Sequence, residues 1–81
     1  MEKTQILDVI KKNVLENVDE ISEEELDPQK SMRDYGANSL DIIEIVSGSM
    51  RELNIKIPRS ELTDIQNMDE LAQKFLEYVD K

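Results

Sequence analysis

The chain contains no cysteine, no histidine and no tryptophan, and these absences narrow its chemistry before any motif is considered. Without cysteine and histidine it cannot build a Ser-His or Cys-His catalytic pair, a zinc finger or a thiolate metal site. The lack of disulfides and of an apolar run near the first residue favours a cytoplasmic protein. Only carboxylates, lysines and hydroxyls remain for chemistry. A helical domain of 81 residues offers little concavity to desolvate them, so we do not expect an enzyme.

Glycine and proline occur only twice each, and aromatic residues make up 4% of the chain, which favours a helical protein over a β-sandwich. No apolar run approaches the roughly 18 residues that a membrane span needs. The 81 residues suffice for one small domain, which we expect to cover residues 1–81.

The chain has few basic residues. It contains ten Lys and Arg and nineteen Asp and Glu, which gives a net charge of −9. Such a surface repels nucleic acid and anionic lipid, and it attracts proteins that carry basic patches. The alternative is that the acidity only keeps a small protein in solution.

Apolar residues recur at helical spacing in three longer segments and leave a long loop after the first. The predicted helices cover residues 2–18, 39–53, a short segment from about 59, and 68–79, and the loop covers 19–38. This order predicts an all-α protein, a small four-helix bundle of three longer helices and one short helix.

The predicted helices begin at recognisable caps. Thr4 suits the start of the first helix, and Asn38 and Asn67 suit the second and the last. Asp41 and Glu70 stand three residues after the two asparagines, where an acid can return a hydrogen bond to the cap.

The apolar spacing also predicts which residues of the second helix and of the loop face the core. The inward stripe of the second helix is expected to contain Ile43, Val46, Met50 and Leu53. Gly48 lies mid-helix, where a small residue indicates close approach of another backbone or of a partner, or a weak point of the helix. The loop is expected to be pinned to the core by Ile21, Leu26, Met32 and Tyr35. Its acidic run lacks the glycine and the order of an EF-hand, so only weak, non-specific divalent binding is left open.

Ser39, at the start of the second predicted helix, has a hydroxyl whose role its neighbours do not explain. Asn38 already supplies the cap, so Ser39 falls at the first helical position, among unpaired N–H groups at the positive end of the dipole. Serine near a helix start commonly does no more than cap it. Without a base, this hydroxyl is a poor nucleophile, but it can be the substrate of another enzyme that brings the base.

Three stretches of the chain resemble the acyl carrier proteins, which carry acyl chains as thioesters on a 4′-phosphopantetheine arm. YGANSL, residues 35–40, is similar to the family motif Leu-Gly-x-Asp-Ser-Leu. DIIEIV, residues 41–46, is similar to the acidic and apolar helix that follows this motif, and IKIP, residues 55–58, to the family's Ile-x-Ile-Pro turn. The resemblance extends over essentially the whole chain and implies a bundle of the acyl-carrier type.

By this resemblance, Ser39 is the attachment site of the arm. A phosphopantetheinyl transferase would move the arm from coenzyme A to the hydroxyl with the help of magnesium, and no metal site in the chain itself is implied. The thiol would then come from the covalent cofactor, which explains why the chain needs no cysteine. Ile65 falls where the family flanks the arm, and it can equally be a core residue.

The resemblance also implies a docking face on the second helix. Leu40, Glu44, Ser47 and Arg51 are expected to share an outer face, and Ile42 is a further candidate contact. In the family this face meets acyltransferases, ketosynthases and related biosynthetic enzymes through their basic patches. The chain itself is expected to be a monomer, and the alternative for this face is a solvated helix surface.

Departures from the family pattern indicate a specialised carrier. Asn38 replaces the usual aspartate, keeps the cap and removes a charge, which favours a transferase of broad specificity. Arg51 and Arg59 are basic where fatty-acid carriers are acidic, and Ser49 replaces a larger apolar residue, so a narrower interior is expected. The Gly-Ala-Asn-Ser-Leu form resembles free-standing carriers of polyketide pathways, including donors of an acetyl-derived unit for β-branching.

Other functions stay open from the sequence. A fatty-acid carrier and an aminoacyl or peptidyl carrier are the nearest, although peptidyl carriers usually approach their serine through a histidine that this chain lacks. An unmodified acidic helical adaptor of the same fold is the third. It predicts that Ser39→Ala leaves function intact, whereas a carrier would lose function with its fold retained.

Overall fold

The computed structural model describes residues 2–18, 21–62 and 65–79. The elements in these ranges are α1 (Lys3–Asn17), η1 (Glu23–Glu25), η2 (Met32–Tyr35), α2 (Ser39–Leu53), η3 (Arg59–Glu61) and α3 (Met68–Val79). The described ranges contain no β-strand, only an isolated bridge between Ser31 and Asn67. The all-α bundle, with a short helical turn before the last helix, is therefore confirmed. Residues 19 and 20 of the predicted loop lie outside the described residues.

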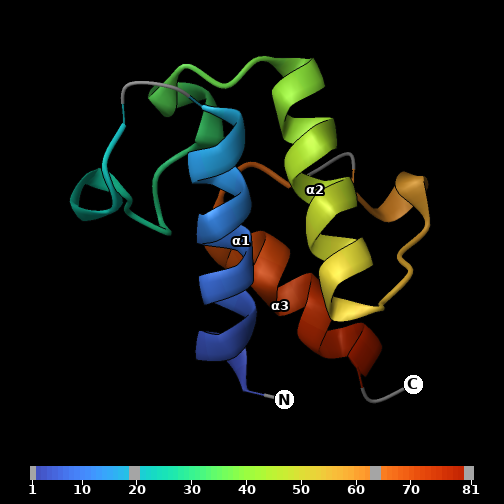
Figure 1. Cartoon of the computed structure of the whole chain (residues 1–81). Helices are drawn as coiled ribbons and strands as arrows, with labels where there is room; N and C mark the ends of the chain where they lie inside the picture. Colours follow the sequence, from blue (N-terminus) through green and yellow to red (C-terminus); the bar gives the residue numbers. More distant parts are fainter. Residues whose placement is uncertain (1, 19–20, 63–64, 80–81) are drawn as a thin grey trace.

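Helix α1 contacts both α2 and α3. α1 and α2 run antiparallel, and α3 crosses them at an angle (Figure 1). The core side chains of α1 and α3 repeat every three or four residues as predicted; they are Ile6, Ile10, Val14, Met68, Leu71, Ala72 and Phe75. Full burial of one such large side chain stabilises the fold by about 1.5–3 kcal/mol. Thr4 was wrongly expected as the first cap, since α1 begins at Lys3 with Glu2 as its cap.

The buried face of α2 differs from the predicted stripe. Ile43 is 45% exposed, whereas Ile45 is fully buried, so placing Ile43 in the core was wrong. The segment from Ile42 to Val46 offers two apolar stripes, and the stripe that contains Ile45 is the buried one. Ser49, four residues after Ile45, lies on the same face of the helix. Ser49 is fully buried, and its hydroxyl donates to the Ile45 carbonyl at 2.8 Å, which satisfies its polar group inside the core.

Gly48 lies where α2 meets α1. A Cβ at this position would run into the Asn13 side chain, whose Cγ would be 3.2 Å away. Asn13 is buried, and its Nδ2 donates to the Val9 carbonyl at 2.9 Å. The close neighbour at Gly48 is thus a side chain of α1 rather than another backbone.

The loop between α1 and α2 is pinned to the core as predicted. Met32 is fully buried, and Ile21, Leu26 and Tyr35 are partly buried against the core. The Tyr35 hydroxyl also donates to the Asp27 carbonyl at 2.9 Å. Two short 3-10 helices, η1 and η2, give this loop local structure.

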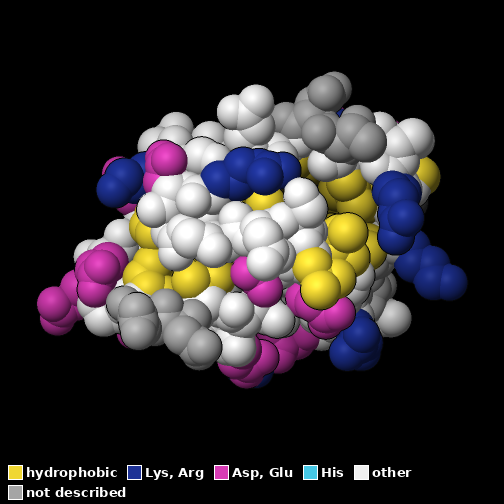
Figure 2. Space-filling model, turned by 90° about the horizontal axis from the view of Figure 1, so that it is seen from above, with side chains coloured by type: hydrophobic (Ala, Val, Ile, Leu, Met, Phe, Trp, Pro, Cys, Tyr) yellow, Lys and Arg dark blue, Asp and Glu magenta, His cyan; other side chains and the backbone are white. Residues whose placement is uncertain are grey.

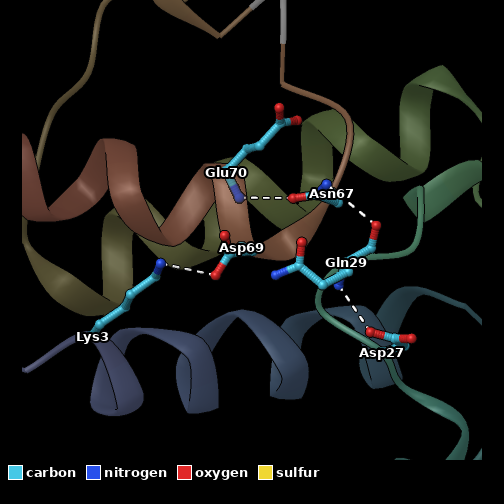
Figure 3. Close-up of polar contacts among 6 residues, drawn as sticks. All are labelled: Lys3, Asp27, Gln29, Asn67, Asp69 and Glu70. Carbon is cyan, nitrogen blue, oxygen red and sulfur yellow. Dashed lines mark hydrogen bonds and ion pairs between the residues drawn. The ribbon is translucent and has the colours of Figure 1, made fainter.

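The loop is also tied to the start of α3 (Figure 3). Asn67 Nδ2 donates to the Gln29 carbonyl at 3.4 Å, and the Asp69 N–H donates to the Pro28 carbonyl at 3.0 Å. The Lys3 ammonium lies 2.8 Å from the Asp69 carboxylate. This contact, mainly as a hydrogen bond, holds the pKa of Asp69 below its ordinary value. None of the described helices is long and apolar enough to cross a bilayer.

Candidate functional site

The start of α2 is built by the reciprocal cap that the sequence predicts. Asn38 Oδ1 accepts from the Asp41 N–H at 2.8 Å, and Asp41 Oδ2 accepts from the Asn38 N–H at 3.1 Å. Ser39 is the first helical residue, and it is exposed. Because the cap is complete without it, the Ser39 hydroxyl is left available at the mouth of the helix.

A sharp turn brings the chain from η2 into α2. Gly36 has φ of 89°, and its N–H donates to the Arg33 carbonyl at 3.0 Å, which closes η2. A Cβ at Gly36 would meet no atom within 4 Å, so the glycine is needed for its backbone conformation rather than for space. Ala37, the next residue, is buried and anchors the turn in the core.

Arg33 is the polar neighbour of Ser39 that sequence reasoning missed. Its Nη2 donates to Ser39 Oγ at 3.3 Å. The two residues are six positions apart, across a loop whose path cannot be read from apolar spacing. The only available signal was the presence of a base just before the serine in a strongly acidic chain.

A groove with a volume of about 720 Å³ runs beside Ser39. Its lining residues come from α2, from the segment after it and from the loop before it; they are Ser39, Ile42, Ile43, Val46, Ser47, Met50, Ile57, Arg59, Leu62, Ile65, Gln66, Ser31 and Arg33. Figure 2 views this end of the molecule from above, with apolar side chains beside Lys and Arg side chains and acids along the lower edge. The groove is therefore apolar along its walls and carries two arginines, Arg33 and Arg59.

The six other residues expected to contact the arm or a partner fall into two groups. Leu40, at 65% exposure, and the exposed Glu44 and Arg51 lie on the outer surface. Ile42, Ser47 and Ile65 are half-buried and line the groove. Ser47 was expected on the outer face with Leu40, Glu44 and Arg51, but it lines the groove with Ile42. Ile43 joins Leu40 as an exposed large apolar side chain. Their roles in docking and in flanking the arm stay predictions.

Within the described residues, no three acidic side chains gather in a way that could hold a metal ion. Of the acids of α2, Asp41 closes the cap and Glu52 forms an ion pair. Glu52 lies 2.6 Å from the Lys12 ammonium and raises the pKa of that lysine, chiefly through their hydrogen bond. The mouth of α2 therefore offers one hydroxyl and one guanidinium beside a largely apolar groove, while the Asp41 carboxylate is engaged in the cap.

Comparison with known proteins agrees with this geometry. Residues 12–75 match the family described as the phosphopantetheine attachment site. The polyketide biosynthesis acyl-carrier-protein AcpK of Bacillus subtilis is 34% identical over 90% of this chain and 89% of its own length. An acyl carrier protein of Wolinella succinogenes is 34% identical over 84% of this chain and 90% of its own.

A solved structure is similar in both sequence and fold. It is the crystal structure of the curacin biosynthetic pathway HMG synthase in complex with acetyl donor-ACP. The matching chain is 37% identical, with a TM-score of 0.83, over 93% of this chain and 96% of that one. On the family match and these identities, the chain belongs to the acyl carrier proteins, a family of carriers with a covalently attached 4′-phosphopantetheine.

Proposed function

We propose that this carrier holds its 4′-phosphopantetheine on Ser39 and presents acyl groups to enzymes of polyketide biosynthesis. The observation that supports the attachment site most directly is the exposed Ser39 hydroxyl at the mouth of α2, spared by the complete cap of Asn38 and Asp41. The site fits the group, because the hydroxyl is open to a second protein and the groove beside it offers apolar walls.

Attachment requires one substitution at phosphorus. Ser39 Oγ forms a bond to the phosphorus of the pantetheine-bearing phosphate of coenzyme A. The bond from that phosphorus to the oxygen shared with the 5′-phosphate of the nucleotide breaks, and adenosine 3′,5′-bisphosphate leaves with the electron pair. The hydroxyl proton passes to a base of the phosphopantetheinyl transferase, since this chain has no histidine to accept it.

The attached group supplies the thiol on which the acyl group is carried. The chain's own residues anchor and surround it. Ser39 would fix one end, and Ile42 of α2 and Ile65 of the segment after it both line the groove where the arm would be flanked. The half-buried Ser47 offers a hydroxyl on the same wall as Ile42.

The relatives point to the pathway and to the kind of partner. One relative is named for polyketide biosynthesis, and the similar solved structure is described as an acetyl donor in complex with an HMG synthase. We infer that this chain delivers a short acyl group to an enzyme of that kind. Acyltransferases and ketosynthases of the same pathway would meet the same surface.

The proposed docking surface consists of Leu40, Ile43, Glu44 and Arg51 on the outside of α2. Leu40 and Ile43 are large apolar side chains exposed at 65% and 45%, and such side chains become anchors when a partner desolvates them. Glu44 adds an acid that a basic patch can meet. We expect Leu40→Ala to weaken binding to the curacin-pathway HMG synthase by about tenfold or more.

Titration calorimetry with that synthase measures the effect. Lys56→Gln, an exposed change after α2, serves as a control that should leave the affinity unchanged. Equal affinities for the wild type and Leu40→Ala would place the docking surface elsewhere.

Intact mass measurement tests the attachment site. The protein is incubated with coenzyme A, magnesium and a broad-specificity phosphopantetheinyl transferase, beside Ser39→Ala and the matched variant Ser47→Ala. We expect one phosphopantetheine increment on the wild type and on Ser47→Ala, and none on Ser39→Ala. An increment on Ser39→Ala would refute the site. No increment on the wild type, with a transferase active on another carrier, would favour an unmodified adaptor.

A further inference from the structure

We propose that Arg33 binds the phosphodiester of the arm attached at Ser39 and thereby sets the direction in which the arm leaves the helix. The inference rests on the proposed attachment at Ser39 and adds a positioning residue to it. Neither the motif around the serine nor the predicted docking face includes Arg33, because it comes from η2.

The distance between the two side chains is the first support. Arg33 Nη2 already donates to Ser39 Oγ at 3.3 Å. The phosphorus would be bonded to this same oxygen, so the anionic oxygens of the phosphodiester would lie beside the guanidinium. A planar guanidinium with five N–H donors suits paired hydrogen bonds to phosphate oxygens, whereas a neutral hydroxyl uses only one of these donors.

The charge of Arg33 is not committed to a carboxylate. The ion pairs among the described residues involve Lys3, Lys12 and Lys74, and none involves Arg33. This is notable in a chain with nineteen acids and ten bases. Asp34 is adjacent in sequence and exposed, yet the side-chain contact that Arg33 makes in the structure is to Ser39.

The backbone that carries Arg33 is fixed on both sides. Met32 is fully buried, and its N–H donates to the Gln66 carbonyl at 2.9 Å. Gly36 closes the turn by donating to the Arg33 carbonyl at 3.0 Å. The Arg33 N–H donates to Ser31 Oγ at 3.3 Å. A guanidinium on so restrained a turn loses less freedom when it binds an anion, which favours binding.

The surroundings of Ser39 add to the attraction for an anion and give it a direction. The first N–H groups of α2 lack helical partners, and the cap residue Asn38 is neutral. The Asp41 carboxylate in the first turn is engaged by the Asn38 N–H at 3.1 Å. Arg33 and Arg59 both line the groove that runs beside Ser39. A phosphodiester held by Arg33 therefore starts the arm at the groove rather than in open solvent.

Phosphorus NMR of the modified protein tests this contact directly. We compare the wild type with Arg33→Gln, Arg33→Lys and the charge-matched control Lys56→Gln, which removes an exposed positive charge outside both the groove and the proposed docking surface. Intact mass first confirms that each carries one arm. We expect the ³¹P resonance to shift in Arg33→Gln, to shift less in Arg33→Lys and to stay in place in Lys56→Gln. The guanidinium resonances of Arg33 should move on modification of the wild type.

Thermal melting gives an independent measurement. Attachment of the arm should raise the melting temperature more in the wild type than in Arg33→Gln. We expect the rise on attachment to be about 1–4 °C larger in the wild type. High salt should reduce this advantage.

The outcomes separate the two proposals. If the wild type takes no arm on Ser39, the attachment site fails and this inference fails with it. If the arm is attached but the ³¹P resonance is the same in Arg33→Gln and Lys56→Gln, the attachment stands and the role of Arg33 is overturned.

Discussion

The starts of α2 and α3 use the same local signal for opposite purposes. At α2, Asn38 Oδ1 accepts from the Asp41 N–H at 2.8 Å; at α3, Asn67 Oδ1 accepts from the Glu70 N–H at 2.7 Å. Each acid also returns a hydrogen bond to the backbone, although Glu70 reaches the N–H of Gln66 rather than that of the cap. Capping alone therefore does not determine whether a helix start is functional.

What differs is the first helical residue and its neighbours. Met68 begins α3 and is fully buried, and the loop carbonyls of Pro28 and Gln29 close around that end. Ser39 begins α2 and is exposed, with Arg33 as its polar neighbour. One end is tied into the core, while the other is left exposed.

The largest expected contrast comes from truncating the two first residues. Met68→Ala should cost about 2–5 kcal/mol of unfolding free energy, because it leaves a cavity in the core. Ser39→Ala should stay within about 0.5 kcal/mol of the wild type, because its side chain is exposed. Urea unfolding followed by circular dichroism measures both. A large loss of stability in Ser39→Ala would show that Ser39 has a structural role instead.

The turn that leads into α2 should be the next most sensitive position. Gly36→Ala forces a residue with a Cβ into φ of 89°, which costs about 1–2 kcal/mol. We also expect slower modification by the transferase, since the turn positions both Arg33 and Ser39. Urea unfolding and the initial rate of modification check this. Unchanged stability would mean that the turn relaxes to another conformation.

The two caps should have similar energies and different functional effects. Asn38→Ala and Asn67→Ala should each cost about 1 kcal/mol, or roughly 4–8 °C in melting temperature. Only Asn38→Ala should slow modification, because it frays the turn that holds Ser39. Asn38→Asp, which keeps a capping oxygen, is the matched control for stability. Equal rates for Asn38→Ala and Asn67→Ala would contradict a role for the α2 cap in presenting the serine.

The smallest effect concerns acid stability at the start of α3. The Lys3 ammonium lowers the folded-state pKa of Asp69 from its ordinary value of 3.8. The resulting stability is present above the unfolded pKa and is lost as the pH falls through the folded pKa. Melting temperatures of Asp69→Asn and Lys3→Gln should therefore fall less steeply in acid than that of the wild type. Lys56→Gln should keep the wild-type slope, and a steeper fall in Lys3→Gln would contradict the assignment.

Features governed by neighbours in sequence could be predicted from sequence. The caps at Asn38 and Asn67 and the first helical position of Ser39 follow from residue types three positions apart, and the structure confirms them. The choice between Ile43 and Ile45 for the core could not be predicted, because both fit a helical stripe and the packing against α1 decides between them.

The contact of Arg33 with Ser39 was also beyond sequence patterns. It depends on the left-handed turn at Gly36 and on the path of η2 across the Gln66 carbonyl. Neither is set by a periodic pattern. The open end of α2 could thus be located from sequence, while its most important neighbour required the fold.

The absence of cysteine permits a direct test of the central claim. The chain has no thiol of its own, so any thiol that appears after incubation with coenzyme A and a transferase belongs to the attached arm. Titration of free thiols in the repurified, reduced protein should give one thiol per chain for the wild type and none for Ser39→Ala. No thiol in the wild type, or one thiol in Ser39→Ala, would contradict the account.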